Sequence, residues 1–122
     1  MPELVFFDSH GDVVAYVDDG DDVIFLWSGE PAAIVDDESV FAFDGRHLGW
    51  LMNGWIRDHG GACVYFTEGA TGGPARPART ARPARGARYA RPARAAREMR
   101  PMRPMRSLAW SSLAVGSAFF DA

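Results

Sequence analysis

Short apolar runs alternate with polar, glycine-containing links along residues 4–69. The runs are rich in valine, isoleucine, phenylalanine and tryptophan, which are residues that β-strands favour. None of them has the 3.6-residue spacing of an amphipathic helix. The links Ser9–Gly11, Ser28–Gly29, Asp44–Gly45 and His59–Gly61 are short, and each contains a glycine that can adopt a positive φ. This pattern predicts four β-hairpins in tandem.

The four predicted hairpins repeat one order of residue types. Alignment on Gly11, Gly29, Gly45 and Gly60 places small residues at Ala15, Ala33 and Gly49, then Val64, and large apolar residues at Tyr16, Ile34, Trp50 and Tyr65. Because one hairpin cannot bury its own apolar face, repetition of the unit predicts a pseudo-four-fold assembly around an axis. The small residues suit a crowded position near that axis. The fold class expected for residues 1–69 is therefore all-β.

Residues 74–106 follow a different pattern, a triplet repeat that we call the arm. Its first column varies, with proline most frequent, and its second column is alanine or methionine. The third column is always arginine, at Arg76, Arg79, Arg82, Arg85, Arg88, Arg91, Arg94, Arg97, Arg100, Arg103 and Arg106. Proline interrupts an α-helix, whereas polyproline II has three residues per turn and places every third side chain on one edge. The arm is predicted to be polyproline II-like or disordered, with a helical turn conceivable only in the proline-free stretch 95–100.

Charge is divided sharply between the predicted β-domain and the arm. Residues 1–73 carry fourteen acidic side chains against Arg46 and Arg57, a net charge of −12. The arm carries eleven arginines and Glu98, a net charge of +10, and the whole chain has a net charge of −3. Such an asymmetry indicates either a basic segment that binds external anions or two segments that neutralise each other.

The end of the chain is apolar again. Residues 70–73 form a glycine-rich junction before the arm, and residues 107–122 contain Leu108, Trp110, Leu113, Val115, Phe119 and Phe120. Disordered termini rarely carry so many large apolar side chains, so this tail is expected to dock on the β-domain or on a neighbouring copy. The predicted organisation is a four-hairpin domain at 1–69, the junction, the arm at 74–106 and a docking segment at 107–122.

Several strings of the sequence resemble the bacterial 4-fold β-flower domain family. They are FDSHGDVVAYV at residues 7–17, FDGRHLGW at 43–50, GWIRD at 54–58 and FTEGATGGP at 66–74, with SLAWS at 107–111. Basic triplets between these parts are also a feature of that family, more often with valine and lysine. The resemblance implies the four-hairpin fold. It implies no activity and no functional residue.

Catalytic and metal-binding chemistry finds little support in the sequence. Cys63 is the only cysteine and lies in a predicted strand, which is typical of a small buried apolar residue. His10, His47 and His59, with Asp8, Asp44 and Asp58 beside them, fit the polar turns of hairpins better than a metal site. The acidic run 18–22 lacks the ligand order of an EF-hand. Trp27, Trp50 and Trp55 are expected in the core, or around a small pocket. We predict no enzyme, no cofactor and no metal.

The arginine column carries the functional prediction. A row of guanidinium groups can pair with carboxylates or phosphates, so the chain is expected to be a non-catalytic interaction or structural module whose arm engages an acidic protein surface, its own or a partner's. Nonspecific binding of nucleic acid or another polyanion is the alternative, and a small-ligand or metal-binding β-domain is a weaker one. A low-complexity spacer is also compatible with the triplets.

With no basic leader and no apolar run of membrane length, the chain is expected to be cytoplasmic. Self-association would help to stabilise so small a core.

Overall fold

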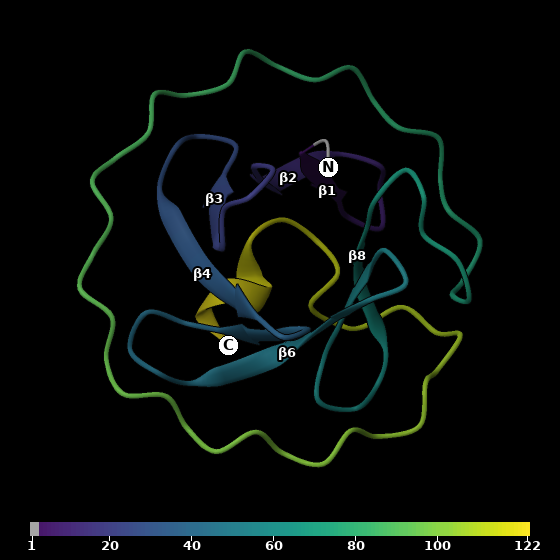
Figure 1. The fold of residues 1–122 in the computed structure, drawn as a ribbon. Coiled ribbons are helices and arrows are strands. Elements are labelled where there is room, and N and C mark those ends of the chain that lie inside the picture. Colours follow the sequence, from purple (N-terminus) through teal and green to yellow (C-terminus); the bar gives the residue numbers. More distant parts are fainter. Residues whose placement is uncertain (1–2) are drawn as a thin grey trace.

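The computed structural model of the protein describes residues 3–122 as an antiparallel β-barrel enclosed by a ring of extended chain (Figure 1). The strands are β1 (Leu4–Phe7), β2 (Val13–Val17), β3 (Val23–Leu26), β4 (Pro31–Asp36), β5 (Ser39–Phe41), β6 (His47–Met52), β7 (Trp55–Arg57) and β8 (Cys63–Phe66). Each strand pairs with the next along the chain, and β8 pairs with β1 to close the barrel. A single 3-10 helix, η1 (Ala118–Asp121), completes the regular structure of the described residues.

The prediction of four tandem hairpins is confirmed. The hairpins are β1–β2, β3–β4, β5–β6 and β7–β8, and their turns contain Gly11, Gly29, Gly45 and Gly61, all with positive φ. The alignment of the fourth repeat on Gly60 is therefore wrong by one residue, because Gly61 has the equivalent conformation. Tyr65, rather than Val64, pairs with Ile56 in the way that Ala15 pairs with Phe6.

Side chains alternate between the inside and the outside of the barrel, and both sets are buried. The inner set includes Phe6, Ile24, Val40 and Ile56 together with the predicted small residues Ala15 and Ala33. The outer set includes Val5, Phe7, Tyr16, Val23, Phe25, Trp55 and Phe66. Burial of both faces explains why the strand sequences are continuously apolar rather than alternating with polar residues.

The C-terminal tail, expected to dock on the β-domain or on a neighbouring copy, places its last phenylalanines inside the barrel. Phe119 and Phe120 are buried among the inner side chains, and the ring of Phe120 stacks on Tyr65 at 5.5 Å. A Cβ added to Gly49 would lie 2.0 Å from the backbone oxygen of Arg57 and 3.1 Å from the Phe119 ring, so glycine leaves room for both. Figure 1 shows the yellow tail at the centre of the barrel. The tail thus forms part of the core, and the β-domain is incomplete without it.

The tail also supports the place where the barrel closes. Between β1 and β8 the strand register contains one pair, Phe7 with Phe66, whereas the other neighbouring strands have three or four. Ala109 and Ser111 exchange backbone hydrogen bonds with Cys63 of β8, and the carbonyl of Ala114 accepts one from Ser9 beyond β1. These contacts connect the two strands through the tail.

The arm runs around the outside of the barrel as a ring, drawn in green in Figure 1. Residues 74–106 contain neither helix nor strand, and residues 95–100 form no helical turn. No helix in the described part of the chain is both long and apolar enough to cross a membrane.

Candidate functional site

The arm is attached to the barrel by a backbone hydrogen bond at every ninth residue. The N–H groups of Thr80, Tyr89, Glu98 and Ser107 donate to the carbonyl oxygens of Gly11, Gly29, Gly45 and Gly61, at 3.0, 3.0, 2.8 and 3.1 Å. Thr80, Tyr89 and Glu98 occupy the first column of the triplets, and Ser107, the first residue of the tail, continues that column. None of the four is proline, which has no N–H to donate. Gly86 and Ala95 add bonds to the carbonyls of Trp27 and Phe43. A residue with a free N–H therefore recurs in the first column after every three triplets, and each recurrence meets the turn of the next hairpin.

The turn glycines allow the arm to approach the barrel closely. A Cβ atom added to Gly11, Gly29, Gly45 or Gly61 would lie 2.1, 1.9, 2.0 or 2.2 Å from a carbonyl oxygen of the arm, in Ala78, Ala87, Ala96 or Met105 respectively. Real Cβ atoms do not approach a backbone oxygen so closely. Glycine is therefore required here for two reasons, the positive φ of the turn and the contact with the arm.

Arginines of the arm pair with carboxylates in the order in which these lie around the closed barrel, starting at the end of β8. Within residues 3–122, nine arm arginines form such pairs: Arg79 and Arg82 with Glu68, Arg85 with Glu3, Arg88 with Asp18, Arg91 with Asp21, Arg94 with Asp22, Arg97 and Arg100 with Asp36, and Arg103 with Glu38. The Arg91 and Arg94 pairs are bidentate. Arg76 instead donates to the backbone carbonyls of Thr67 and Glu68.

Three of these pairs shift the pKa of a carboxylate or of an arginine. The hydrogen bond from Arg94 outweighs partial desolvation and lowers the pKa of Asp22 below its ordinary value. The pKa of Asp21 is also lowered: desolvation opposes the shift, but the hydrogen bond from Arg91 and those from the backbone prevail. The bond from Asp18 raises the pKa of Arg88. Asp21 and Asp22 are therefore held in their charged forms beside the arm.

The same guanidinium groups cover the aromatic rings on the outside of the barrel. Arg79 and Arg82 lie over the ring of Phe7, at 5.7 and 5.4 Å from its centroid. Arg88 and Arg91 repeat this arrangement over Phe25, and Arg97 and Arg100 over Phe41. The arm thus serves as an outer layer that buries aromatic surface while its charges meet carboxylates.

The second column of the arm faces away from the barrel. Met99, Met102 and Met105 are 90%, 93% and 91% exposed. These methionines therefore form no packed apolar edge with Tyr89, which is itself 61% exposed. The arginine and hydrogen-bonding columns face the barrel, which leaves the remaining column in solvent.

Each place where one hairpin meets the next has the same construction, and we call these four places seams. A seam contains an outward cross-strand pair: Tyr16 with Phe25, Ile34 with Phe41, Trp50 with Arg57, or Phe66 with Phe7. Two residues beyond the first member of each pair lies Asp18, Asp36, Met52 or Glu68. Three seams therefore combine a phenylalanine, a carboxylate and arm arginines. The β6–β7 seam has Arg57 in place of the phenylalanine and Met52 in place of the carboxylate.

Arg57 is buried in this exceptional seam, at 2% exposure. Its Nη1 donates to the carbonyls of Gly61 and Ser107 at 2.8 and 2.7 Å, and its Nη2 donates to Gly72 at 2.8 Å. Arg57 thereby joins the last hairpin turn at Gly61, the beginning of the tail at Ser107 and the glycine-rich junction at Gly72. Sequence reasoning counted Arg57 only as a charge.

The remaining candidate residues have structural explanations. Asp8 and Asp58 accept hydrogen bonds from backbone N–H groups of their own turns, and Asp44 pairs with Arg46. Cys63 is buried, and burial raises the pKa of its thiol. Asp18, Asp21 and Asp22, from the acidic run, pair with arm arginines. Among residues 3–122 no three His, Cys, Asp or Glu side chains are grouped as metal ligands.

Two histidines do come together, although His10 stays on the exposed turn after β1. Nδ1 of His47 lies 3.0 Å from Nε2 of His59, and Nε2 of His47 lies 3.2 Å from Oγ of Ser39. Burial, followed by the charges of His59 and Arg100, lowers the pKa of His47 to about 4. His47 is therefore a neutral part of the core at neutral pH. Of the three tryptophans expected in the core, Trp50 and Trp55 are buried, and Trp27 donates from Nε1 to the carbonyl of Pro83 on the arm.

Comparison with known proteins agrees with this architecture. No curated protein and no solved structure matches the chain. The family described as 4-fold beta flower protein matches residues 5–119, which include all of the barrel except the first residue of β1, the arm and most of the tail. The chain therefore belongs to the 4-fold beta flower protein family.

Proposed function

We propose that this chain is a non-catalytic structural module whose cationic arm engages an acidic protein surface, namely that of its own β-domain. The arm acts as a clasp that holds the four hairpins together. The observation that carries this proposal is the register between arm and barrel, in which each advance of nine arm residues meets the next glycine turn.

Charge matching supports an intramolecular role over binding of external polyanions. Arg79 to Arg103 already pair with carboxylates, so a phosphate backbone would have to displace these partners before it gained its own contacts. Single exposed ion pairs contribute only about 0–1 kcal/mol each. Here they add to backbone hydrogen bonds and covered aromatic rings, which together hold the arm in one position.

Limited trypsin digestion tests the clasp directly, because trypsin cleaves after arginine and needs an accessible, mobile chain. In the intact protein at low salt, the arm should resist cleavage far longer than a synthetic peptide of residues 74–106. The double variant Asp18→Asn/Asp36→Asn removes carboxylates that face Arg88, Arg97 and Arg100, and should be cut faster. Asp44→Asn is the matched control, since Asp44 pairs with Arg46 of the barrel.

Titration with fluorescent single- and double-stranded DNA separates the two roles. The intact chain should bind weakly or not at all at physiological salt, while the isolated arm peptide should bind with a steep salt dependence. Rapid cleavage of the arm in the intact protein, together with tight salt-dependent DNA binding, would refute the clasp in favour of a polyanion binder.

A further inference from the structure

Among the described residues, two arm arginines pair with no carboxylate: Arg76, which donates to backbone carbonyls instead, and Arg106. Steps of nine residues relate Arg79, Arg88, Arg97 and Arg106, and the first three pair with Glu68, Asp18 and Asp36. The equivalent partner of Arg106 is Met52, which has no charge. Accordingly, Arg106 forms no ion pair with any residue of the described range 3–122. The β6–β7 seam therefore has a guanidinium in place and no carboxylate to meet it.

A second uncompensated cation lies in the same seam. Arg57 occupies the position that Phe7, Phe25 and Phe41 occupy elsewhere, and no carboxylate among the described residues pairs with its buried guanidinium. Its Nε has no hydrogen-bond acceptor there either. A buried charge without a counter-ion is costly, and two cations beside one cavity also repel each other. A bound anion would relieve both penalties.

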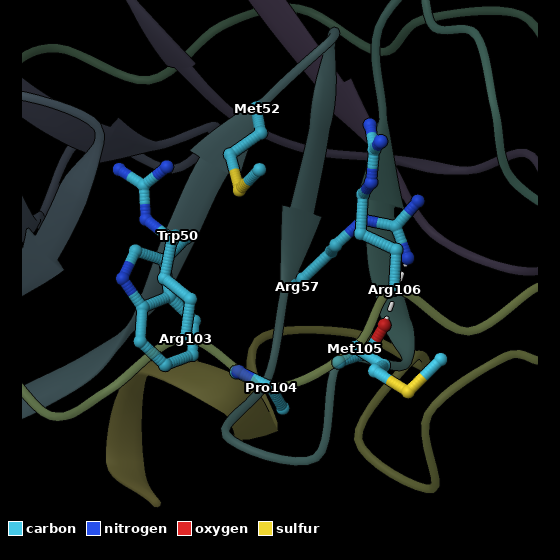
Figure 2. A pocket seen from close by; sticks show the side chains of 8 residues that line it. Trp50, Met52, Arg57, Arg103, Pro104, Met105 and Arg106 are labelled. Carbon is cyan, nitrogen blue, oxygen red and sulfur yellow. Dashed lines mark hydrogen bonds between the residues drawn. The ribbon is translucent and has the colours of Figure 1, made fainter.

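The seam has room for such an anion. A cavity of about 360 Å³ is lined by Trp50, Met52, Arg57, Gly61, Arg103, Pro104, Met105 and Arg106. Figure 2 shows Trp50 and Arg103 on one side, Arg57 and Arg106 on the other, and Met52 and Pro104 between them. Arg103 already pairs with Glu38 at 2.7 Å, which leaves Arg106 as the donor free for a ligand. The other walls include the indole ring of Trp50, the thioether of Met52 and the ring of Pro104, so they suit an apolar group.

We propose that the β6–β7 seam is a binding site for a small organic acid, with a carboxylate beside an aromatic or branched apolar body. The carboxylate pairs with Arg106 in the field of Arg57, and so takes the place that Glu68, Asp18 and Asp36 fill in the other seams. The apolar body packs on Trp50 and Met52. The volume is within the range of small-ligand sites, about 300–1,000 Å³.

Calorimetric and NMR titration with phenylacetate tests this assignment on the full chain. Phenylacetate should bind saturably at millimolar concentration or better, shift the Trp50 indole signal and raise the melting temperature. Phenylacetamide has the same body without the charge and should bind at least about tenfold more weakly, since hydrogen bonds to charged groups are the stronger ones. Acetate and inorganic phosphate offer charge without the body and should also bind more weakly.

Two variants locate the site, and a third serves as control. Arg106→Ala should weaken phenylacetate binding by about tenfold or more, because it removes the free donor. Met52→Asp supplies the carboxylate that the other seams have, so it should abolish binding while raising the melting temperature. Arg94→Ala removes a guanidinium that pairs with Asp22 in a different seam, and should leave binding unchanged.

Three outcomes would overturn the proposal. One is the absence of saturable phenylacetate binding to the wild-type chain. Another is equal affinity for phenylacetate and its amide, or for phenylacetate and inorganic phosphate, because either shows that charge and apolar body are not recognised together. The last is binding that survives both Arg106→Ala and Met52→Asp, which would place the ligand elsewhere.

Discussion

The N–H of Tyr89 donates a hydrogen bond to the carbonyl oxygen of Gly29 at 3.0 Å, and the same contact recurs at the other three hairpin turns. In this bond a residue from the variable column of the arm meets the one glycine that each hairpin turn requires. The bond therefore links the two repeats of the molecule, the triplets of the arm and the hairpins of the barrel.

Replacement of Tyr89 by proline should release the arm at one turn. Tyr89→Pro leaves the triplet pattern intact and resembles the neighbouring triplets, but it removes the N–H. The carbonyl of Gly29 then loses its partner, which should lower the free energy of unfolding by about 1–3 kcal/mol in urea denaturation. Tyr89→Ala is the control, because it removes the exposed ring and keeps the donor. Equal stability of the two variants would contradict the proposed role of the bond.

Glycine at the hairpin turns should be required for its close contact with the arm as well as for its positive φ. Gly29→Ala introduces a Cβ 1.9 Å from the carbonyl oxygen of Ala87, whereas Gly20→Ala adds one with nothing within 4 Å. Both glycines have positive φ, at 113° and 76°. Gly20→Ala should therefore lower the free energy of unfolding by about 1–2 kcal/mol, the penalty for a left-handed residue. Gly29→Ala should lower it considerably more, and thermal unfolding of the pair measures the contribution of the arm contact.

The tail should behave as core. Phe119→Ala removes a fully buried ring from the barrel interior, which should lower the free energy of unfolding by about 3–5 kcal/mol. Leu108→Ala, at a residue that is 70% exposed in the same tail, should change it by less than about 0.5 kcal/mol. If Phe119→Ala unfolded at the wild-type urea concentration, the tail would not be part of the cooperative unit.

The lowered pKa of His47 predicts that the folded chain loses stability in mild acid. Its pKa is lowered from 6.5 to about 4 in the folded chain, first by burial and then by the charges of His59 and Arg100, while Glu98 opposes the shift. The unfolded chain binds a proton near pH 6.5 and the folded chain does not, so the contribution of His47 is complete above that pH and declines as the pH falls towards 4.

Chemical denaturation between pH 7 and pH 4 measures this dependence. His47→Gln should flatten the slope, and His10→Gln, on the exposed first turn, should retain it. A wild-type slope that persists in His47→Gln would assign the titration to other groups.

Below pH 4, protonation of Asp21 and Asp22 should loosen the arm. Their pKa values are lowered in the folded chain, so these carboxylates contribute stability only while they are ionised.

Local composition and repetition were sufficient to predict the hairpins. β-branched and aromatic runs around Gly11, Gly29 and Gly45 determine strands and turns through nearest neighbours, so the hairpins could be recognised without the structure. The fourth repeat was misaligned by one residue because Gly60 and Gly61 are adjacent and only the backbone conformation distinguishes them.

The arm was harder to interpret because its meaning depends on the barrel. Its threefold pattern is visible in the sequence, but the ninefold placement of Thr80, Tyr89, Glu98 and Ser107 looks like random variation until the spacing of the turns is known. Likewise, Met52 and Arg57 are ordinary residues in isolation. They become exceptional only when the four seams are compared. The other three seams have a carboxylate at the position of Met52 and a phenylalanine at the position of Arg57.

Insertion of one additional Pro-Ala-Arg triplet between Arg91 and Pro92 tests the central claim most directly. The insertion preserves composition, charge pattern and threefold geometry, but it moves the donors at Glu98 and Ser107 out of register with Gly45 and Gly61. If the arm is a clasp built on a nine-residue register, the melting temperature should fall and trypsin should cut the arm after the insertion. A melting temperature and a digestion pattern equal to those of the wild type would contradict the register and the clasp that depends on it.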